Sequence, residues 1–313
     1  MSEPHIGILL AVFNGAIHLD EQLSSLVNQT YVNWQLLAGD DASTDGGRSI
    51  LEGFAAQQKG QNKVTLLEGP GEGAAAHFLS LIKRAPDHLP EGSWLAFCDQ
   101  DDVWTEDKLA RGVAALSEVA SNTPALYCSR TWVVDYDLSR PRLSPHRPRP
   151  MGFRNALVQN VVSGNSLLLN AAATRLLLSA TQHVEAVVMH DWWVYLLISG
   201  AGGYLIHDDE PTLFYRQHAA NEIGANFGLR AKGNRLMRML RGEFRSWNDA
   251  NIAALIEVRG YLSPQAQADL DGFVAFRTAS ARQRILGLRN SGLYRQTRAS
   301  TFALWVAAGL KLL

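Results

Sequence analysis

Residues 94–104 read WLAFCDQDDVW, an apolar run that ends in three closely spaced carboxylates. The apolar part predicts a buried strand of a parallel sheet. Asp99, Asp101 and Asp102 follow within four residues, where that strand ends. Carboxylates packed this closely repel one another, so keeping them ionised favours a nearby cation. Hard oxygen ligands suit Mg²⁺ or Mn²⁺, which bind a few carboxylates and complete their shell with phosphate oxygens.

These carboxylates also have a plainer interpretation. A helix is expected over residues 107–119, and acidic residues are favourable at the positive end of a helix. One Asp would be explained in this way. Three after a buried strand favour the metal site, because carboxylates with a purely structural role are seldom packed so closely.

A second acidic stretch, DDASTDG at residues 40–46, follows an earlier apolar run. Asp, Ser and Gly also make turns and helix caps, so this stretch alone is a weak signal. Two acidic strand ends in one α/β unit are a stronger joint signal. Ligands of such sheets bind beyond the carboxyl ends of the strands, so both stretches are expected to face one crevice.

Apolar runs and helical patterns alternate outward from this point. Strands are expected over residues 6–13, 34–38, 63–67, 94–98, 125–134, 166–170, 204–207 and 212–216. Helices are expected around 19–27 and over 47–57, 74–84, 107–119, 171–180 and 190–199, with an exposed Pro- and Arg-rich loop over 139–150. This order predicts an α/β fold with a Rossmann-type, mainly parallel sheet flanked by helices. After Gly228 the pattern is helical and basic, so we expect a catalytic domain over 1–227 and a helical C-terminal extension over 228–313.

The composition is that of a folded protein. The 313 residues are 47% hydrophobic and 19% charged, which excludes a disordered chain, a collagen and a disulfide-rich mini-protein. Two cysteines, Cys98 and Cys128, are too few for a disulfide framework and indicate a reducing compartment. No signal peptide or membrane span is recognisable, so we expect a cytoplasmic location, extending to the inner face of the cell membrane.

Six motifs, in order across residues 5–225, together resemble a known family. They are AVFNG at 11–15, NQTY at 28–31, DDASTDG at 40–46, DQDDVW at 99–104, HDWW at 190–193, and YRQH at 215–218 followed by Asn221 and Gly224. The chain resembles the inverting glycosyltransferases of family 2, with the GT-A fold, and particularly their bacterial rhamnosyltransferase-like members. Each motif is weak by itself, whereas the ordered set is highly specific.

The resemblance implies a donor site. Asp41 is expected to contact the nucleotide base, beside the loop that carries Ala11, Phe13 and Asn14. Asp99 is expected to lie near the ribose. One departure is His77, where relatives often carry Asn after a Gly-rich turn.

The resemblance also implies a metal site. Asp101 matches the metal-binding Asp of the family's DxD motif, with Asp102 beside it. His218 matches a histidine that approaches the metal or the diphosphate. Arg216 lies two residues before His218, so on a strand both would project to the face where a diphosphate meets them.

Asp191 falls where the family places its catalytic base. Sugar transfer needs a carboxylate that takes the proton of the acceptor hydroxyl, opposite the leaving group and from another segment than the metal ligands. A helix N-cap is the simpler role, and the two can coexist. Trp192 and Trp193 are either core aromatics or acceptor-stacking residues, and at most one of them is expected to face an acceptor.

The sequence therefore predicts a metal-dependent, inverting glycosyltransferase. The best match is transfer of L-rhamnose from dTDP-L-rhamnose to a glycan or glycolipid acceptor in cell-surface polysaccharide or lipopolysaccharide synthesis. The alternative is a phosphatase of the haloacid-dehalogenase type, with Asp99 as nucleophile and Asp101 as acid/base. That motif normally follows a first strand, and the other ordered motifs would then be unexplained. A third interpretation is a module that binds nucleotide sugars without turning them over.

Charge is unevenly distributed along the chain. Residues 228–313 hold 14 Lys and Arg against 5 Asp and Glu, a net charge of +9, which leaves −10 for residues 1–227. Arg235, Arg238, Arg241 and Arg245 fall near one helical face. Further arginines, at 282, 284, 289, 295 and 298, precede an apolar run over 302–313. Basic amphipathic helices that end in an apolar segment suit an anionic membrane surface. A helical cap with solvated arginines is the alternative. No recognisable module indicates nucleic acid as a partner.

Overall fold

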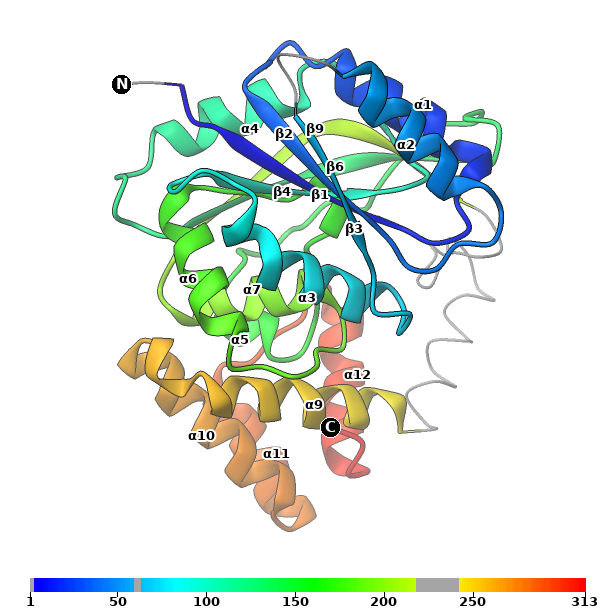
Figure 1. Ribbon diagram of the computed structural model, residues 1–313. Helices are drawn as coiled ribbons and strands as arrows, with labels where there is room; N and C mark the ends of the chain where they lie inside the picture. Colours follow the sequence, from blue (N-terminus) through cyan, green and yellow to red (C-terminus); the bar gives the residue numbers. More distant parts are fainter. Residues whose placement is uncertain (1–2, 59–62, 218–241) are drawn as a thin grey trace.

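The computed structural model describes residues 3–58, 63–217 and 242–313, and these form a sheet covered by helices (Figure 1). The strands of the sheet are β1 (Ile6–Val12), β2 (Trp34–Asp40), β3 (Val64–Glu68), β4 (Trp94–Asp99), β5 (Val103–Trp104), β6 (Ala125–Val134), β7 (Arg142–Leu143), β8 (Leu168–Leu169) and β9 (Tyr204–Arg216). Their order is β3-β2-β1-β4-β8-β6-β9-β5, with β7 on β6. The long pairings, β1 with β2 and β4, β2 with β3, and β6 with β9, are parallel. Each antiparallel pairing joins only two residues per strand, so the sheet is mainly parallel, as predicted.

Helices cover both faces of the sheet because its central strands are apolar on both sides. Ile8 and Leu10 belong to one buried cluster with side chains of α1, α2 and α4, whereas Leu9 belongs to the other cluster with α3, α6 and α7. Side chains alternate between the faces of a strand, so three consecutive apolar residues supply both cores. The helices are α1 (Ala16–Val27), α2 (Gly47–Gln57), α3 (Ala74–Arg84), α4 (Lys108–Ser117), α5 (Phe153–Ala156), α6 (Ala171–Thr181) and α7 (His190–Gly200).

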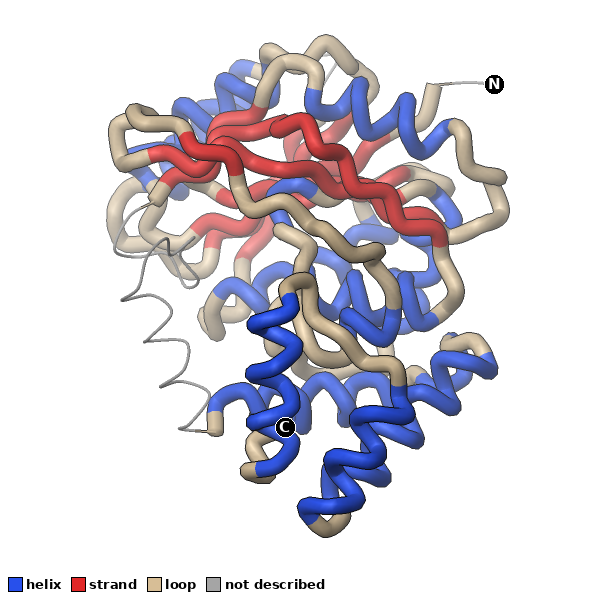
Figure 2. Tube along the Cα trace, turned by 180° about the vertical axis from the view of Figure 1, so that it is seen from behind, coloured by secondary structure: helices blue, strands red, loops and turns tan. Residues whose placement is uncertain are grey.

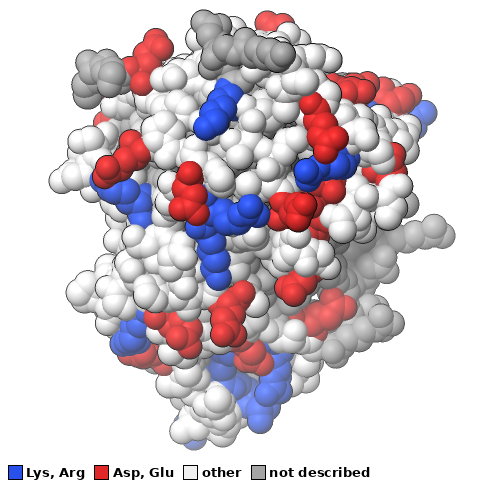
Figure 3. Space-filling view, viewed as in Figure 1, with Lys and Arg blue, Asp and Glu red and all other residues white. Residues whose placement is uncertain are grey.

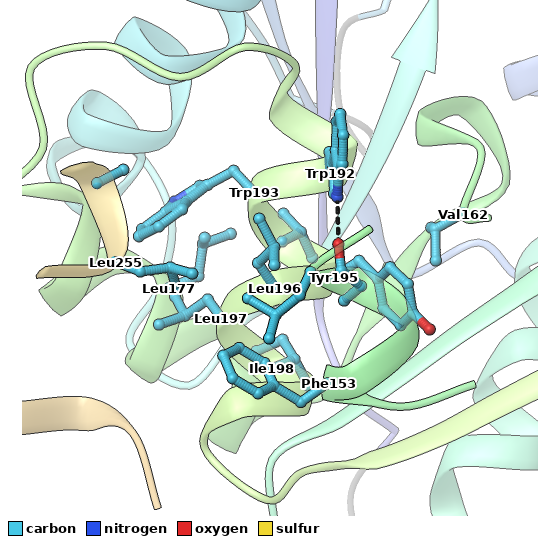
Figure 4. Close-up of a cluster of buried hydrophobic side chains, with 14 of the residues drawn as sticks. Phe153, Val162, Leu177, Trp192, Trp193, Tyr195, Leu196, Leu197, Ile198 and Leu255 are labelled. Carbon is cyan, nitrogen blue, oxygen red and sulfur yellow. Dashed lines mark hydrogen bonds between the residues drawn. The ribbon is translucent and has the colours of Figure 1, made fainter. Parts of the chain in front are cut away.

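In the described residues from 242 on, four helices form a further layer beneath α7 (Figure 1). They are α9 (Glu243–Glu257), α10 (Pro264–Thr278), α11 (Ala281–Ser291) and α12 (Arg298–Gly309). Leu255 of α9 lies with Trp193 and Leu177 in one buried cluster (Figure 4). Phe273 and Leu304 belong to the same cluster, so the extension shares a core with the sheet domain. The predicted boundary at 227/228 lies outside the described residues.

Local signals set several helix ends. The Asn170 side chain accepts a hydrogen bond from the Ala173 amide and caps α6. Ser263 caps α10 in the same way, with Pro264 at the first helical position, where its missing N–H costs nothing. The helices predicted over 47–57 and 74–84 have those bounds in the structure.

Three features of the structure differ from the sequence predictions. The two strands predicted over 204–207 and 212–216 form one strand, β9, whose pairing with β6 shifts register between Ser129 and Trp132. Strand β5 follows the acidic turn and was not predicted. The loop over 139–150 contributes β7 and then reaches the C-terminal helices, where Arg149 N donates to Gln296 Oε1. Figure 2 shows the sheet and the C-terminal helices from the opposite side.

Cys98 and Cys128 are buried and form no disulfide, as expected. Within the described part of the chain, no helix has both the length and the apolar character needed to cross a membrane.

Candidate active site

The carboxyl ends of β1, β2 and β4 bring the predicted motifs together. Val12 pairs with Asp40 across the β1–β2 ladder, and Ala11 pairs with Asp99 across the β1–β4 ladder. The loops after these strands therefore start side by side at one edge of the sheet. This is the edge at which open α/β sheets bind their ligands.

The loops after β1 and β2 are locked to each other. Asn14 N donates to Ser43 Oγ (3.0 Å), and Thr44 N donates to Asn14 Oδ1 (2.9 Å). Asp45 accepts from Ala16 N at the start of α1 (2.8 Å), where a carboxylate favours the helix dipole. Asn14 and Ala42 have positive φ angles of 48° and 64°. A non-glycine residue in this region is held there by its surroundings, so the two loops have one defined shape.

Gln100 ties the acidic turn to the loop after β1. Its Oε1 accepts from Phe13 N (2.8 Å), and its Nε2 donates to Phe13 O (3.0 Å). A Cβ on Gly15 would lie 2.2 Å from Gln100 Oε1, so a larger residue there would displace the Gln100 side chain from these hydrogen bonds. The Phe13 ring remains 56% exposed. Gln100 was not singled out in the sequence, where it reads as the variable position of the motif.

Asp41 is buried and holds a glycine-rich turn. Its two oxygens accept hydrogen bonds from Gly71 N (2.7 Å) and Gly73 N (3.1 Å). His77 is buried against the same place, with its Nε2 close to Gly39. The structure therefore assigns Asp41 a local role in shaping the turn after β3. Its contact with a nucleotide base stays a prediction.

The three carboxylates of the acidic turn are not equivalent. Asp99 and Asp101 are partly exposed, whereas Asp102 is fully buried and accepts a hydrogen bond from Asn165 Nδ2. Burial, with the nearby charges of Asp101 and Asp99, raises the pKa of Asp102 well above its usual range. Asp102 thus points toward Asn165 inside the protein, and its expected place beside Asp101 as a metal ligand has no support in this arrangement. The metal-binding role of Asp101 stays a prediction.

Lys108 lies beneath this turn and was overlooked in the sequence. Its side chain is buried, with Nζ 4.1 Å from the centre of the Trp104 ring. Burial lowers the pKa of Lys108 to about 8, although the charges of Cys98 and Asp102 oppose this shift. A lysine six residues after an acidic turn is typical of a solvated helix start, so only the packing reveals its buried position.

Arg216 braces the acidic turn from β9. Its guanidinium donates to Asp101 O (3.0 Å), to Tyr136 O and to the Glu21 carboxylate, and the side chain is 2% exposed. Protein partners therefore occupy its donors, and the expectation that Arg216 projects toward a diphosphate is corrected. His218, placed with Arg216 in the sequence, lies outside the described residues, as do Asn221 and Gly224.

Asp191 lies at the start of α7, in a different segment. Its Oδ1 accepts from Trp192 N (2.6 Å), and Asn160 and the Gly164 amide also hydrogen-bond to the carboxylate. Burial raises the pKa of Asp191 to about 6, because the hydrogen bonds offset only part of the desolvation. The predicted desolvation is therefore present. The neighbouring His190 stacks on Phe78 with ring centres 3.8 Å apart, and burial lowers the pKa of His190 to about 3.

One short loop connects the acidic turn to Asp191. Within residues 160–166, Gly164 contacts Asp191, and the adjacent Asn165 donates to Asp102. Ser163 Oγ donates to Asn165 Oδ1 (2.8 Å) and fixes the amide orientation. Asn165 is 1% exposed, and no sequence motif marked it. The role of Asn165 can be recognised only from its contact with Asp102, which is distant in the sequence.

Trp192 and Trp193 belong to the core. They are 2% and 1% exposed, and their indole N–H groups donate to Ala156 O (2.7 Å) and Thr181 Oγ1 (3.1 Å) (Figure 4). Neither ring presents a face to a ligand. The expectation that one of them stacks on an acceptor is corrected, and the core interpretation holds.

The carboxylates of the acidic turn fit a divalent cation that prefers oxygen ligands. Within the described part of the chain, no three His, Cys, Asp or Glu side chains form a metal cage. Two partly exposed carboxylates at a strand end suit Mg²⁺ or Mn²⁺, which are held by one or two carboxylates together with substrate phosphates. The residues present therefore fit a cation that arrives with a diphosphate.

Known proteins resemble this chain over the same region. The sequence model of glycosyl transferase family 2 matches residues 8–174, more than half of the chain. The dTDP-rhamnosyl transferase RfbG of Shigella flexneri is 27% identical over 233 residues, which cover 72% of this chain and 78% of that protein. The UDP-Glc:alpha-D-GlcNAc-diphosphoundecaprenol beta-1,3-glucosyltransferase WfgD of Escherichia coli is 29% identical over 117 residues, 37% of this chain and 42% of its own length.

A solved structure shares the fold. The crystal structure of S. aureus TarS 1-349 in complex with UDP-GlcNAc matches with a TM-score of 0.54 at 14% identity, over 98% of this chain and 90% of that one. The fold is thus that of the GT-A glycosyltransferases, and the phosphatase interpretation has no support. With its family model spanning the acidic strand ends described above, the chain belongs to glycosyl transferase family 2.

Proposed function

We propose that the protein transfers L-rhamnose from dTDP-L-rhamnose to a glycan or lipid-linked glycan, with inversion at the anomeric carbon. The observation that carries the proposal is the placement of two carboxylate sites from separate segments. Asp99 ends β4 and Asp101 follows it in the turn, Asp191 lies in the first turn of α7, and the loop over 160–166 contacts both Asp102 and Asp191. An in-line displacement needs this separation, since the base and the leaving group act on opposite sides of the sugar.

Asp191 is the base in this proposal. The acceptor oxygen forms a bond to the anomeric carbon while the bond from that carbon to the diphosphate oxygen breaks. The acceptor proton passes to the Asp191 carboxylate, and the electron pair leaves with the diphosphate. A pKa of about 6 suits this role, because the group is ionised at neutral pH and still basic enough to take a proton.

The acidic turn holds the diphosphate end of the donor. Asp101, with Asp99 nearby, would bind Mg²⁺ or Mn²⁺ and leave Asp102 to its hydrogen bond with Asn165. The cation would offset the negative charge of the departing diphosphate. Arg216 holds the backbone of Asp101, so the turn is braced before any ligand arrives.

The loops after β1 and β2 surround the nucleoside. Asn14 and Ser43 fix their relative position, and the exposed Phe13 ring offers an apolar face at their rim. Asp41 shapes the adjoining glycine-rich turn. The choice of dTDP-L-rhamnose is supported by the printed name of the Shigella relative, and a lipid-linked acceptor by that of the Escherichia coli relative. We place the reaction on the cytoplasmic side of the cell membrane, where such acceptors are built.

Substitution of Asp101 tests the metal and donor assignment. Asp101→Asn removes a ligand charge at nearly constant size, so Mn²⁺-dependent binding of dTDP is expected to weaken at least tenfold. Titration calorimetry of dTDP with and without Mn²⁺ measures this. Asp107→Asn makes the same chemical change at an exposed residue of the α4 N-terminus and serves as the matched control.

Unchanged metal-dependent binding in Asp101→Asn would disprove the metal assignment. The sugar is tested separately, by measuring transfer from dTDP-L-rhamnose, UDP-GlcNAc and GDP-mannose to extracted lipid-linked acceptors. Product from either of the last two donors alone would replace rhamnose in the proposal and leave the reaction class intact.

A further inference from the structure

The last helix of the chain presents an apolar stripe to the outside. Phe302, Val306 and Leu310 are 70%, 39% and 58% exposed, and their spacing of four residues places them on one face of α12. The opposite face, with Leu304 and Ala308, is buried against the core. Exposed apolar residues scattered singly need no explanation, whereas a row along one helix indicates a partner.

A shallow hollow of about 270 Å³ adjoins this stripe. Its lining is Arg149, Arg298, Thr301, Phe302 and Trp305. Arg149 is held over the Tyr294 ring at 4.2 Å, and its Nη1 donates to Arg295 O (3.3 Å). The hollow thus joins two guanidinium groups to an aromatic lining and contains no carboxylate.

The surroundings of the stripe are basic. Residues 272–313 contain seven Lys or Arg residues and no Asp or Glu. Four exposed cations of this stretch have no carboxylate within ion-pair distance among the residues that the structure describes: Arg282, Arg289, Arg298 and Lys311. The same holds for Arg149, which lies against this stretch.

Nearby arginines outside this surface are paired differently. Arg154 binds Asp269, Arg259 binds Asp271, and Arg277 binds Asp249. Figure 3 shows the same mixture on the face viewed there, where basic and acidic side chains lie next to one another. The absence of acidic partners is therefore a local property of the α11–α12 region. Solvated arginines alone would not be expected to segregate in this way.

We propose that α12, with the hollow beside it, docks on an anionic phospholipid bilayer. Arg149 and Arg298 bind a lipid phosphate in the hollow, and Phe302, Val306 and Leu310 enter the upper acyl region. A bilayer supplies in one surface the negative charge and the hydrocarbon that this face requires. A second copy of the chain fits less well, because a two-fold contact would bring the unpaired arginines of both copies together.

This proposal extends the proposed function by naming the surface on which a lipid-linked acceptor would be met. It rests on the second basic stretch that the sequence indicated, with Arg282, Arg289 and Arg298 before the apolar run over 302–313. Arg235, Arg238 and Arg241 lie outside the described residues, and the α12 surface stands without them.

Vesicle co-sedimentation of the full chain tests the proposal, without donor or acceptor. Vesicles of phosphatidylcholine alone are compared with vesicles in which phosphatidylglycerol is a third of the lipid. The protein is expected to pellet with the anionic vesicles and to be released by salt. Each cation near such a surface contributes about fivefold in partitioning, so Arg149→Gln combined with Arg298→Gln is expected to weaken binding about 25-fold.

A second variant separates the apolar contribution from charge. Phe302→Ser combined with Leu310→Ser is expected to weaken partitioning at least tenfold at low and at high salt alike. Matched controls are Arg175→Gln on α6 and Ile256→Ser on α9, both exposed residues outside this surface. They are expected to pellet like the parent protein, and thermal unfolding checks that every variant is folded.

Equal pelleting with neutral and anionic vesicles would overturn the proposal, as would equal losses in the control variants. A dimer in sedimentation velocity that Phe302→Ser dissociates would show that a second copy covers this face instead. The assay needs no catalysis, so a failure of the rhamnosyl assignment leaves its result unaffected.

Discussion

The carboxyl group of Asp191 receives hydrogen bonds from Trp192 N, Asn160 and Gly164 N, and burial still raises its pKa to about 6. Asp191→Asn keeps the size and a hydrogen-bond acceptor but removes the basicity. Turnover is expected to fall about 10²- to 10⁴-fold, with donor affinity unchanged. In the parent protein, kcat/KM is expected to fall as pH drops below about 6, because the protonated carboxyl group cannot accept the acceptor proton. Steady-state rates between pH 5 and 8, together with calorimetric donor binding, measure both effects.

The same substitution has a stability signature that shows the variant to be folded. The folded state holds the Asp191 proton up to a pKa of about 6, against 3.8 in the unfolded chain. Folding therefore takes up protons in this window, and the Asp191 contribution to stability declines as pH rises through it. Asp191→Asn is expected to melt above the parent protein at pH 8 and with it below pH 4. A retained anomeric configuration in the product, or loss of donor binding with turnover, would contradict the assignment of Asp191.

Residue identity alone could reveal only part of this site. Asp99 and Asp101 were singled out by their close spacing after a buried strand, and Asp191 by the resemblance to family 2. Asp102 looked the same in the sequence and differs only because Asn165, 63 positions away, faces it inside the protein. Trp192 and Trp193 suit a core as well as a sugar site, and the enclosing residues decide for the core.

At the scale of elements, the loop over 160–166 contacts both the acidic turn and α7 and so fixes their relative position. Asn165→Ala leaves the buried Asp102 carboxyl group without its donor, a loss of about 1–3 kcal/mol in the free energy of unfolding. Both kcat and the KM for donor are expected to change, because Asp102 and Asp191 contact the same loop. Urea unfolding and steady-state kinetics measure the two effects.

Asn170→Ala is the matched control for this loop. It removes the cap of α6 and the hydrogen bonds of Asn170 with Ala125 N and Thr123 O, so it costs at least about 1 kcal/mol, and it touches neither the turn nor Asp191. Its kinetics are expected to equal those of the parent protein despite the lower stability. If Asn165→Ala also affects stability alone, the loop only supports the fold.

Elements with strong local signals were predictable, whereas those defined by distant pairing were not. The helices over 47–57 and 74–84 are predicted by the spacing of their apolar residues. The acidic residues 208–210, followed by Pro211, predict an interruption between two strands. In the structure, β9 continues through them and pairs with β6 on both sides. Strand β5 has two residues and exists through its pairing with β9. Local pattern carries no information about such pairings, since they depend on a partner about a hundred residues away.

At the scale of the molecule, the C-terminal helices and the sheet domain share one core. Leu255 is fully buried against α7, and its neighbour Ile256 is 53% exposed. Leu255→Ala is expected to lower the free energy of unfolding by about 2–5 kcal/mol, because a cavity opens beside Trp193. Ile256→Ala is expected to change it by less than about 0.5 kcal/mol. Chemical denaturation followed by tryptophan fluorescence measures both.

The form of the transition carries further information. One cooperative unfolding step is expected for the parent protein and for Leu255→Ala, because the buried cluster runs from β1 to α12 without interruption. Two separate unfolding steps, of which Leu255→Ala shifts only the first, would show that the extension folds independently. The charge difference between the two halves of the sequence suggested such a division, whereas the packing argues against it.

The order in which the sheet is joined has a consequence for the growing chain on the ribosome. Val103 of β5 pairs with Phe214, and the backbone of Asp101 is held by Arg216. Translation adds about 5–20 residues per second, so on the order of ten seconds separate the synthesis of the acidic turn from that of the strand that braces it. During this interval β1, β2, β3 and β4 have been synthesised and can pair with one another, whereas the acidic turn still lacks its contacts with β9. The nascent polypeptide thus acquires a sheet first and a braced acidic turn only when β9 has emerged.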